Sequence, residues 1–265
     1  MIGLFDSGLG GLSVYRQLKM LLPHTPVVYV ADTKRAPYGA RTQAELALFS
    51  TQIIDFLQAY PVSQVFIGCN TVSANCYDML RARYTRLPLF ELIASGVSES
   101  VATSSRGIGY FATAASVNTG VFKQAVSECS DLPVYDVACP SFVPLVESGQ
   151  THGQATEQAV AEYLLPIMDS IDTLVLGCTH YPFLADTIQG LIAKHNQNIT
   201  LIDPAKTAVQ GLVTGLAQQV TTPTTQPTEP HTADVFYTTG DTARFDELAY
   251  QLIGQRVQSR PLVLE

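Results

Sequence analysis

The sequence is poor in charge, and in positive charge above all. Only 14% of its 265 residues are charged, and 15 Lys and Arg stand against 23 Asp and Glu, which gives a net charge of −8 and a pI near 5.0. Because binding to phosphate backbones requires clustered Lys and Arg, this balance argues against nucleic acid or an anionic membrane as the main partner. A small acidic substrate remains compatible, since helix N-termini and backbone N–H groups hold carboxylates locally.

Cysteine is also scarce, and long apolar runs are missing. The five cysteines are an odd number and no secretory leader precedes the apolar run at residues 2–5, so we expect reduced thiols in a cytoplasmic protein. No apolar stretch approaches the roughly 18–20 residues needed to cross a bilayer. The hydrophobic content of 46% is still ample for a packed core, which predicts a soluble globular protein.

Short apolar runs rich in β-branched or aromatic residues alternate with segments of helical period, such as residues 42–59. This alternation predicts an α/β protein with mostly parallel sheets that are flanked by helices. The predicted strands are residues 2–5, 27–30, 64–67, 89–93, 107–111, 133–137, 172–176, 199–202 and 234–238.

An internal repeat predicts two pseudo-symmetric domains. VFIGCNT (65–71) is echoed by TLVLGCTH (173–180), and IGLF (2–5) by IGYF (108–111). We expect a first domain of residues 1–95 plus 207–265, a second domain of residues 96–206, and an active site in the cleft between them. The Thr- and Pro-rich residues 221–232 predict a surface loop, after which the strand at 234–238 returns to the first sheet.

Polar residues follow several of these strands directly. Because ligands of open parallel sheets bind beyond the carboxyl ends of the strands, these residues can converge on one cleft. They are Asp6-Ser7, Cys69-Asn70-Thr71, Thr113 and Cys178-Thr179-His180.

The glycine-rich turn DSGLGG (6–11) follows the first strand and leads into a helix. A carboxylate at Asp6 would repel a phosphate, and the G-x-G-x-x-G pattern of dinucleotide folds is absent, so nucleotide binding fits poorly. Asp6 and Ser7 are equally compatible with a simple role as helix caps.

Cys69 and Cys178 stand at matching positions of the repeat, each after a buried strand and before an expected helix. The positive end of a helix dipole and nearby N–H groups are expected to lower the thiol pKa toward neutrality. His180 is close enough to exchange a proton with Cys178, and Asp6 is a candidate to do so with Cys69. The other cysteines lack such neighbours and are interpreted as packing residues; they are Cys76, Cys129 and Cys139.

Several chemistries can use these groups. Cys-x-His with a second Cys and an Asp offers ligands for zinc, although the closely spaced ligand pairs of structural sites are missing. A Cys-His hydrolase needs one nucleophilic thiol and leaves the second without a role. Inversion of a carbon stereocentre needs an acid and a base on opposite faces of the substrate, and two matched thiols supply them without a cofactor.

Six segments resemble the glutamate racemases, a branch of the cofactor-independent aspartate/glutamate racemase superfamily. They occur in the order found in that family and extend over nearly the whole chain. The segments are FDSGLGGLSV (5–14), ADTKRAPYG (31–39), GCNTVSA (68–74), ACPSFVPLVESG (138–149), LGCTHYPFL (176–184) and FYTTGD (236–241).

The resemblance implies roles for individual residues. Cys69 would take the α-proton of D-glutamate and Cys178 that of L-glutamate, with Asp6, His180 and Glu147 assisting. Asp6 and His180 would also contact the substrate. The other implied substrate-binding residues are Ser7, Pro37, Tyr38, Gly39, Asn70, Thr71, Thr113, Ser116 and Thr179.

The resemblance further implies a homodimer that needs neither cofactor nor metal and supplies D-glutamate for bacterial peptidoglycan. The chain departs from the family pattern at ELIASG (91–96), at IDPAK (202–206) and at Ser116, where Thr is common. A racemase for another acidic amino acid remains an alternative, as does a glutamate-binding protein that has lost activity.

Overall fold

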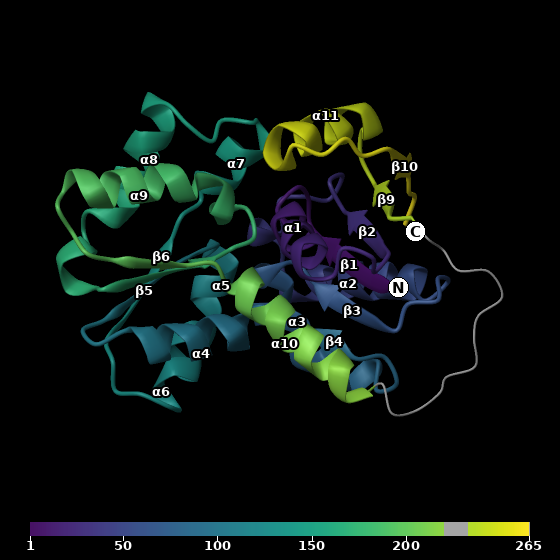
Figure 1. The fold of residues 1–265 in the computed structure, drawn as a ribbon, viewed down its shortest axis with the longest axis horizontal. Helices are drawn as coiled ribbons and strands as arrows, with labels where there is room; N and C mark the ends of the chain where they lie inside the picture. The colour runs from purple at the N-terminus through teal and green to yellow at the C-terminus, as the bar shows by residue number, and fades with distance from the viewer. Residues whose placement is uncertain (220–232, 265) are drawn as a thin grey trace.

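The computed structural model describes residues 1–219 and 233–264, and these form two lobes, each built around a parallel sheet (Figure 1). The chain termini both lie in the first lobe. Its strands, in order across the sheet, are β10 (Ser259–Pro261), β9 (Val235–Thr238), β2 (Val27–Ala31), β1 (Ile2–Asp6), β3 (Gln64–Ile67) and β4 (Leu89–Phe90).

The second sheet repeats the central part of the first. Its parallel strands, in order, are β6 (Val134–Ala138), β5 (Ile108–Ala112), β7 (Thr173–Gly177) and β8 (Thr200–Ile202). The order β6-β5-β7-β8 matches β2-β1-β3-β4, so Cys69 and Cys178 follow equivalent strands. The predicted α/β class with two mostly parallel, helix-flanked sheets is confirmed.

Helices cover both sheets because the central strands are buried on both faces. In the first lobe they are α1 (Gly11–Leu21), η1 (Tyr38–Ala40), α2 (Gln43–Leu57), α3 (Asn70–Arg83) and α11 (Thr242–Ile253). In the second lobe they are α4 (Ile93–Thr103), α5 (Ala114–Thr119), α6 (Val121–Ser127), α7 (Phe142–Glu147), α8 (Gln154–Leu164), η2 (Met168–Ser170), η3 (Tyr181–Leu184) and α9 (Ala185–Lys194).

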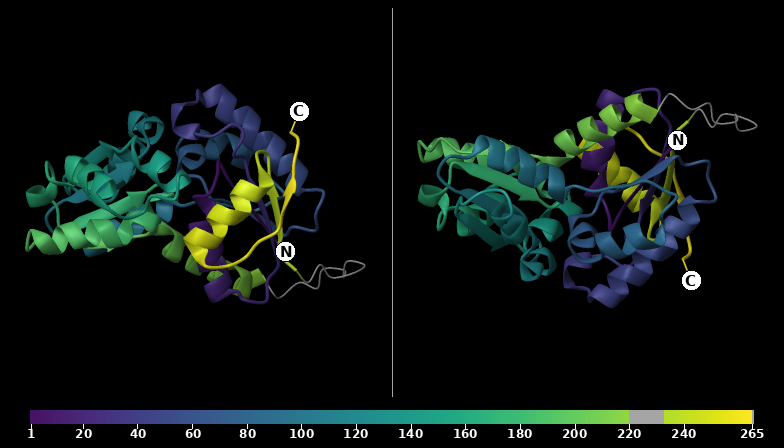
Figure 2. Two further views of the ribbon diagram at one scale, coloured as in Figure 1. Left: turned by 90° about the horizontal axis from the view of Figure 1, so that it is seen from above. Right: turned by 90° about the horizontal axis from the view of Figure 1, so that it is seen from below.

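The helix α10 (Pro204–Gln219) links the lobes and contacts both α4 and α1 (Figures 1 and 2). The chain thus returns to the first lobe, where β9 pairs with β2. The expectation that the strand at 234–238 joins the first sheet is confirmed. The expected loop at 221–232 lies outside the described residues, and the domain boundaries at 95/96 and 206/207 stay a prediction.

The helix predicted at 42–59 shows how local sequence fixes an element. Thr42 accepts a hydrogen bond from the backbone of Glu45, whose carboxylate accepts one from the Thr42 backbone, so a capping box starts α2. The apolar stripe then faces the sheet, with Leu46, Ile53 and Leu57 fully buried.

Two strands differ from the sequence prediction. The strand expected at 89–93 ends at Phe90, because the Glu91 carboxylate accepts the backbone N–H groups of Ile93 and Ala94 and so begins α4. The edge strand β10 was not expected from its polar Ser-Arg-Pro sequence. None of the helices in the described part of the chain is long and apolar enough to cross a membrane.

Candidate active site

Both sheets open a crevice at the carboxyl end of their central strand. In the first sheet the chain leads from β1 to β2 on one side and from β3 to β4 on the other, so the connections after the adjacent strands β1 and β3 diverge. The connections after β5 and β7 diverge in the same way in the second sheet. Asp6 and Cys69 border the crevice of the first sheet, and Thr113 and Cys178 border that of the second. The two crevices contribute to a single cavity.

This interlobe cavity has a volume of about 230 Å³. Of the residues proposed from sequence, it is lined by Asp6, Ser7, Pro37, Tyr38, Gly39, Cys69, Asn70, Thr71, Thr113, Cys178, Thr179 and His180. Ser116 and Glu147 do not line it. Ser116 lies behind Thr113, with 3.0 Å between the two hydroxyls, and Glu147 lies behind His180.

Cys178 is the first member of a chain of polar contacts. Its Sγ lies 3.7 Å from His180 Nδ1, and His180 Nε2 lies 2.7 Å from Glu147 Oε1, which also accepts the Leu9 backbone N–H at 3.0 Å. Burial alone would lower the pKa of His180, but its contacts with Cys178 and Glu147 raise that pKa well above the ordinary value. His180 is therefore held between the thiol of Cys178 and the carboxylate of Glu147.

Cys69 has a different set of neighbours. Its Sγ lies 3.9 Å from Ser7 Oγ, and the nearby Asp6 carboxylate accepts the backbone N–H groups of Gly8 and Gly11 through Oδ2. Asp6 thus caps its own turn, while its Oδ1 lies 3.4 Å from the hydroxyl of Thr179 in the other lobe. Burial raises the pKa of Asp6, although the nearby His180 opposes the rise.

Asn70 has a buried side-chain amide, Nδ2 and Oδ1, without a hydrogen-bond partner among the described residues. The residue is 1% exposed and lines the cavity. Leaving buried polar atoms unpaired costs about 1–3 kcal/mol each. A bound molecule with both donors and acceptors would satisfy this amide.

The two lobes touch directly around the cavity. Ser13 Oγ on α1 lies 2.9 Å from the Thr179 carbonyl oxygen, and the hydroxyls of Thr71 and Thr113 lie 3.0 Å apart. A Cβ at Gly10 would come within 2.4 Å of His180 Nδ1. Gly8, close to Glu147, and Gly10 thus allow the second lobe to approach the DSGLGG turn, which explains these two glycines without a phosphate ligand.

The chain was compared with known proteins. Residues 2–212 match the Asp/Glu/hydantoin racemase family. A glutamate racemase of Gloeobacter violaceus is 38% identical over 266 aligned residues, covering 100% of this chain and 96% of the relative. A second relative, the glutamate racemase of Desulforudis audaxviator, is 42% identical over 79% of this chain and 76% of its own length. This chain belongs to the glutamate racemase family.

The fold of a family member agrees with that assignment. The crystal structure of glutamate racemase from Francisella tularensis in complex with D-glutamate superposes with a TM-score of 0.88 at 29% identity and covers 100% of this chain and 97% of that one. The sequence-based identification as a glutamate racemase family member and an amino-acid racemase is confirmed. The roles of individual residues stay predictions.

Sequence reasoning on this racemase missed part of the cavity lining. The residues concerned are Ala40, Ala114, Cys139, Pro140, Val143, Pro144 and Tyr181. Cys139 follows β6, so the rule that polar residues at strand ends converge could have found it. Pro140, Val143 and Pro144 are apolar and belong to a motif in which only Glu147 had been given a role.

Two expectations about the cysteines are wrong. The pKa of Cys69 is not lowered, because complete burial and the nearby Asp6 raise it well above its usual value and outweigh the position before α3. Cys178 does precede a helix, as expected, although that helix, η3, is short. Cys129 is exposed and is no packing residue, whereas Cys76 is buried away from the cavity.

Proposed function

We propose that the protein interconverts L- and D-glutamate by proton transfer between Cys69 and Cys178, without a cofactor or metal. One observation carries the proposal: the two thiols come from equivalent strands of opposite lobes and line the same cavity. A substrate held there has one thiol on each side. Among the described residues, no group of three or more His, Cys, Asp and Glu is arranged to hold a metal ion.

In the direction from L to D, Cys178 removes the α-proton and Cys69 returns a proton to the opposite face. The thiolate of Cys178 is stabilised by the protonated His180, which Glu147 holds in place from behind. Cys69 begins as a thiol, in keeping with its raised pKa. In the reverse direction Cys69, assisted by Asp6, is the base and Cys178 is the acid.

Binding of glutamate would itself prepare Cys69 for that reverse step. The substrate ammonium brings a positive charge into a cavity in which Asp6 and two thiols are buried. A nearby positive charge favours the thiolate and lowers the pKa of a thiol, most strongly where water is excluded. Closure of the lobes around the substrate would provide that exclusion.

Apart from Asp6 and His180, uncharged groups would hold the substrate. Hydroxyls, amides and backbone N–H groups can bind two carboxylates in a water-poor cavity. The unpaired amide of Asn70 supports this part of the proposal. The proposed set is Asp6, Ser7, Pro37, Tyr38, Gly39, Asn70, Thr71, Thr113, Thr179 and His180, with Ser116 supporting Thr113 from behind.

The wider role proposed is the supply of D-glutamate for peptidoglycan synthesis in the cytoplasm by a homodimer. The five cysteines are all free, as expected for a reducing compartment. Within each chain, residues 1–95 with 207–265 and residues 96–206 are proposed as the two domains that close on the substrate.

Incubation with L-glutamate in D₂O without added cofactor tests the reaction. The expected product is D-glutamate with deuterium at Cα, measured by chiral chromatography and mass spectrometry. Parallel incubation with L-aspartate tests the alternative of another acidic substrate. Absence of deuterium incorporation and of D-glutamate would reject the proposal, and activity that requires a metal would reject its cofactor-free form.

A further inference from the structure

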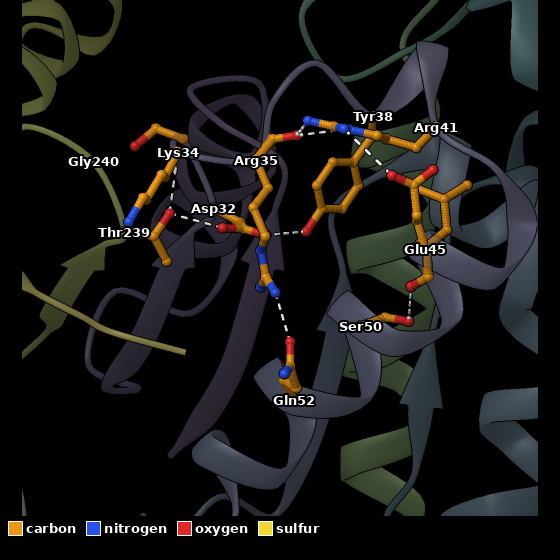
Figure 3. Close-up of polar contacts among 12 residues, drawn as sticks. Asp32, Lys34, Arg35, Tyr38, Arg41, Glu45, Ser50, Gln52, Thr239 and Gly240 are labelled. Atoms are coloured by element: carbon orange, nitrogen blue, oxygen red, sulfur yellow. Dashed lines mark hydrogen bonds and ion pairs between the residues drawn. The ribbon is translucent and has the colours of Figure 1, made fainter. Parts of the chain in front are cut away.

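A polar network centred on Asp32 lies behind the side of the cavity formed by residues 37–39, called here the 37–39 wall (Figure 3). Asp32 directly follows β2 and is fully buried. Its Oδ2 accepts hydrogen bonds from the Tyr38 hydroxyl and from Arg35 Nε, and its Oδ1 accepts one from Thr239 Oγ1 at 2.7 Å. Three hydrogen bonds offset the cost of burying this carboxylate. Because the loss of any one of them would be unfavourable, they hold its neighbours in place.

Thr239 connects this anchor to the far end of the chain. It follows β9, and its hydroxyl accepts the Lys34 backbone N–H at 3.0 Å while donating to Asp32. Its backbone N–H donates to the Ala31 carbonyl. A Cβ at Gly240 would come within 2.5 Å of the Thr33 hydroxyl, so the chain after β9 packs tightly on residues 31–34. Figure 3 shows Thr239 beside Asp32.

The 37–39 wall connects the Asp32 network to the cavity. The Tyr38 ring packs on Phe49, with 5.7 Å between centroids, and the Arg35 guanidinium lies 4.1 Å from the centroid of the Phe49 ring. On the opposite side, a Cβ at Gly39 would approach Thr113 Cβ to 3.1 Å, so the wall reaches the second lobe. A shift of Tyr38 therefore changes the shape of the cavity.

We propose that Thr239 is a positioning residue for substrate binding, which acts through Asp32 and Tyr38 on the 37–39 wall. The inference rests on the proposed function and gives the FYTTGD segment a role. Thr239 itself does not line the cavity. Because the reacting α-carbon lies between the two thiols and the wall carries neither, loosening the wall weakens binding of the substrate more than proton transfer.

The test compares Thr239→Val, which keeps the shape but removes the hydroxyl, with Thr239→Ser, which keeps the hydroxyl. For Thr239→Val we expect the Kd for L-glutamate by calorimetry and the KM to rise about three- to tenfold, as for one lost hydrogen bond. The kcat should change by less than about twofold. Thr239→Ser should bind glutamate like the wild type.

Tyr15→Phe is the matched control. Like Thr239, the buried Tyr15 carries a hydroxyl of the first lobe that donates to a carboxylate. Its acceptor is Asp234, which pairs with Lys19 at 3.2 Å. Tyr15 does not line the cavity. Its loss should lower the melting temperature and leave Kd and KM unchanged.

Unchanged Kd and KM in Thr239→Val, with only a lower melting temperature, would overturn the proposal, as would a fall in kcat at constant KM. If that variant does not fold, Thr239→Ala removes the same hydroxyl and must show the same rise in Kd. A wild-type protein that binds glutamate without racemising it would refute the proposed reaction, but the Kd comparison would still decide the role of Thr239.

Discussion

At the scale of single residues, the two thiols to which we assign the same task have different neighbours. Cys178 faces His180 at 3.7 Å, whereas Cys69 faces Ser7 at 3.9 Å and the buried Asp6. Replacing either thiol by alanine removes the acid in one direction and the base in the other. We expect kcat for racemisation to fall by about 10²- to 10⁴-fold in each variant, as for loss of a general acid or base.

Circular dichroism of the glutamate pool measures that loss. Cys139→Ala is the control, because this third thiol lines the cavity without a titratable neighbour among its hydrogen-bond partners. It should retain activity within about tenfold. Full activity in either Cys69→Ala or Cys178→Ala would contradict the two-base assignment.

The pair of His180 and Glu147 should make stability depend on pH. The contact lowers the pKa of Glu147, despite its burial, and raises that of His180. The stabilisation is therefore complete between about pH 5 and 6.5, where both groups are charged in the folded state, and is lost as pH rises through the raised pKa of His180. Glu147→Gln should lower the free energy of unfolding by about 2 kcal/mol in that window.

Urea unfolding of both proteins at several pH values checks this prediction. The difference between wild type and Glu147→Gln should shrink steadily as the pH is raised above the window. A difference that stays constant or grows toward alkaline pH would mean that the pair contributes through packing and not through charge.

At the scale of elements, the start of α1 is shaped by what it must approach. Gly10 precedes the helix, and a Cβ there would come within 2.5 Å of Thr179 Oγ1 and 2.4 Å of His180 Nδ1. Gly10→Ala should displace His180 from Cys178 and lower kcat by about tenfold or more, since general acid–base groups contribute 10²- to 10⁴-fold. Gly190→Ala in α9, where a Cβ meets nothing within 4 Å, should preserve activity and stabilise slightly.

The same scale shows what the sequence could predict. Nine strands were expected from apolar runs, and all are present. The five that are buried on both faces, β1, β2, β3, β5 and β7, are apolar over most of their length for that reason. The prediction was wrong where a side chain acted on the backbone: the Glu91 carboxylate begins α4 at Ile93, three residues after β4 ends. The strand β10 was missed because edge strands need no apolar pattern and tolerate proline.

The cavity could be predicted only in part. Residues directly after central strands were found, since parallel strands bring their carboxyl ends together. Asp32 and Thr239 were not found, because their contact joins residues 207 positions apart and depends on β9 returning beside β2. The apolar residues Val143 and Pro144 gave no chemical signal at all.

At the scale of the whole molecule, the two thiols of the interlobe cavity are nearly closed off from solvent. Cys69 and Cys178 are 4% and 6% exposed, whereas Cys129 lies on the surface. Iodoacetamide should therefore label Cys129 first, and saturating glutamate should slow labelling of the cavity thiols Cys69 and Cys178 but not that of Cys129, because closure on the ligand limits opening. Mass spectrometry of tryptic peptides gives the three rates, and equal protection of Cys129 would contradict the mechanism.

The unlike surroundings of the two thiols have a consequence for the energetics of the reaction. The two enantiomers of an amino acid have equal free energies in water, so kcat/KM must be identical for both directions. The dissimilar surroundings of Cys69 and Cys178 cannot favour either product at equilibrium. They can only make kcat and KM differ between the two enantiomers by the same factor. Unlike neighbours of the two thiols are therefore compatible with the duplicated fold.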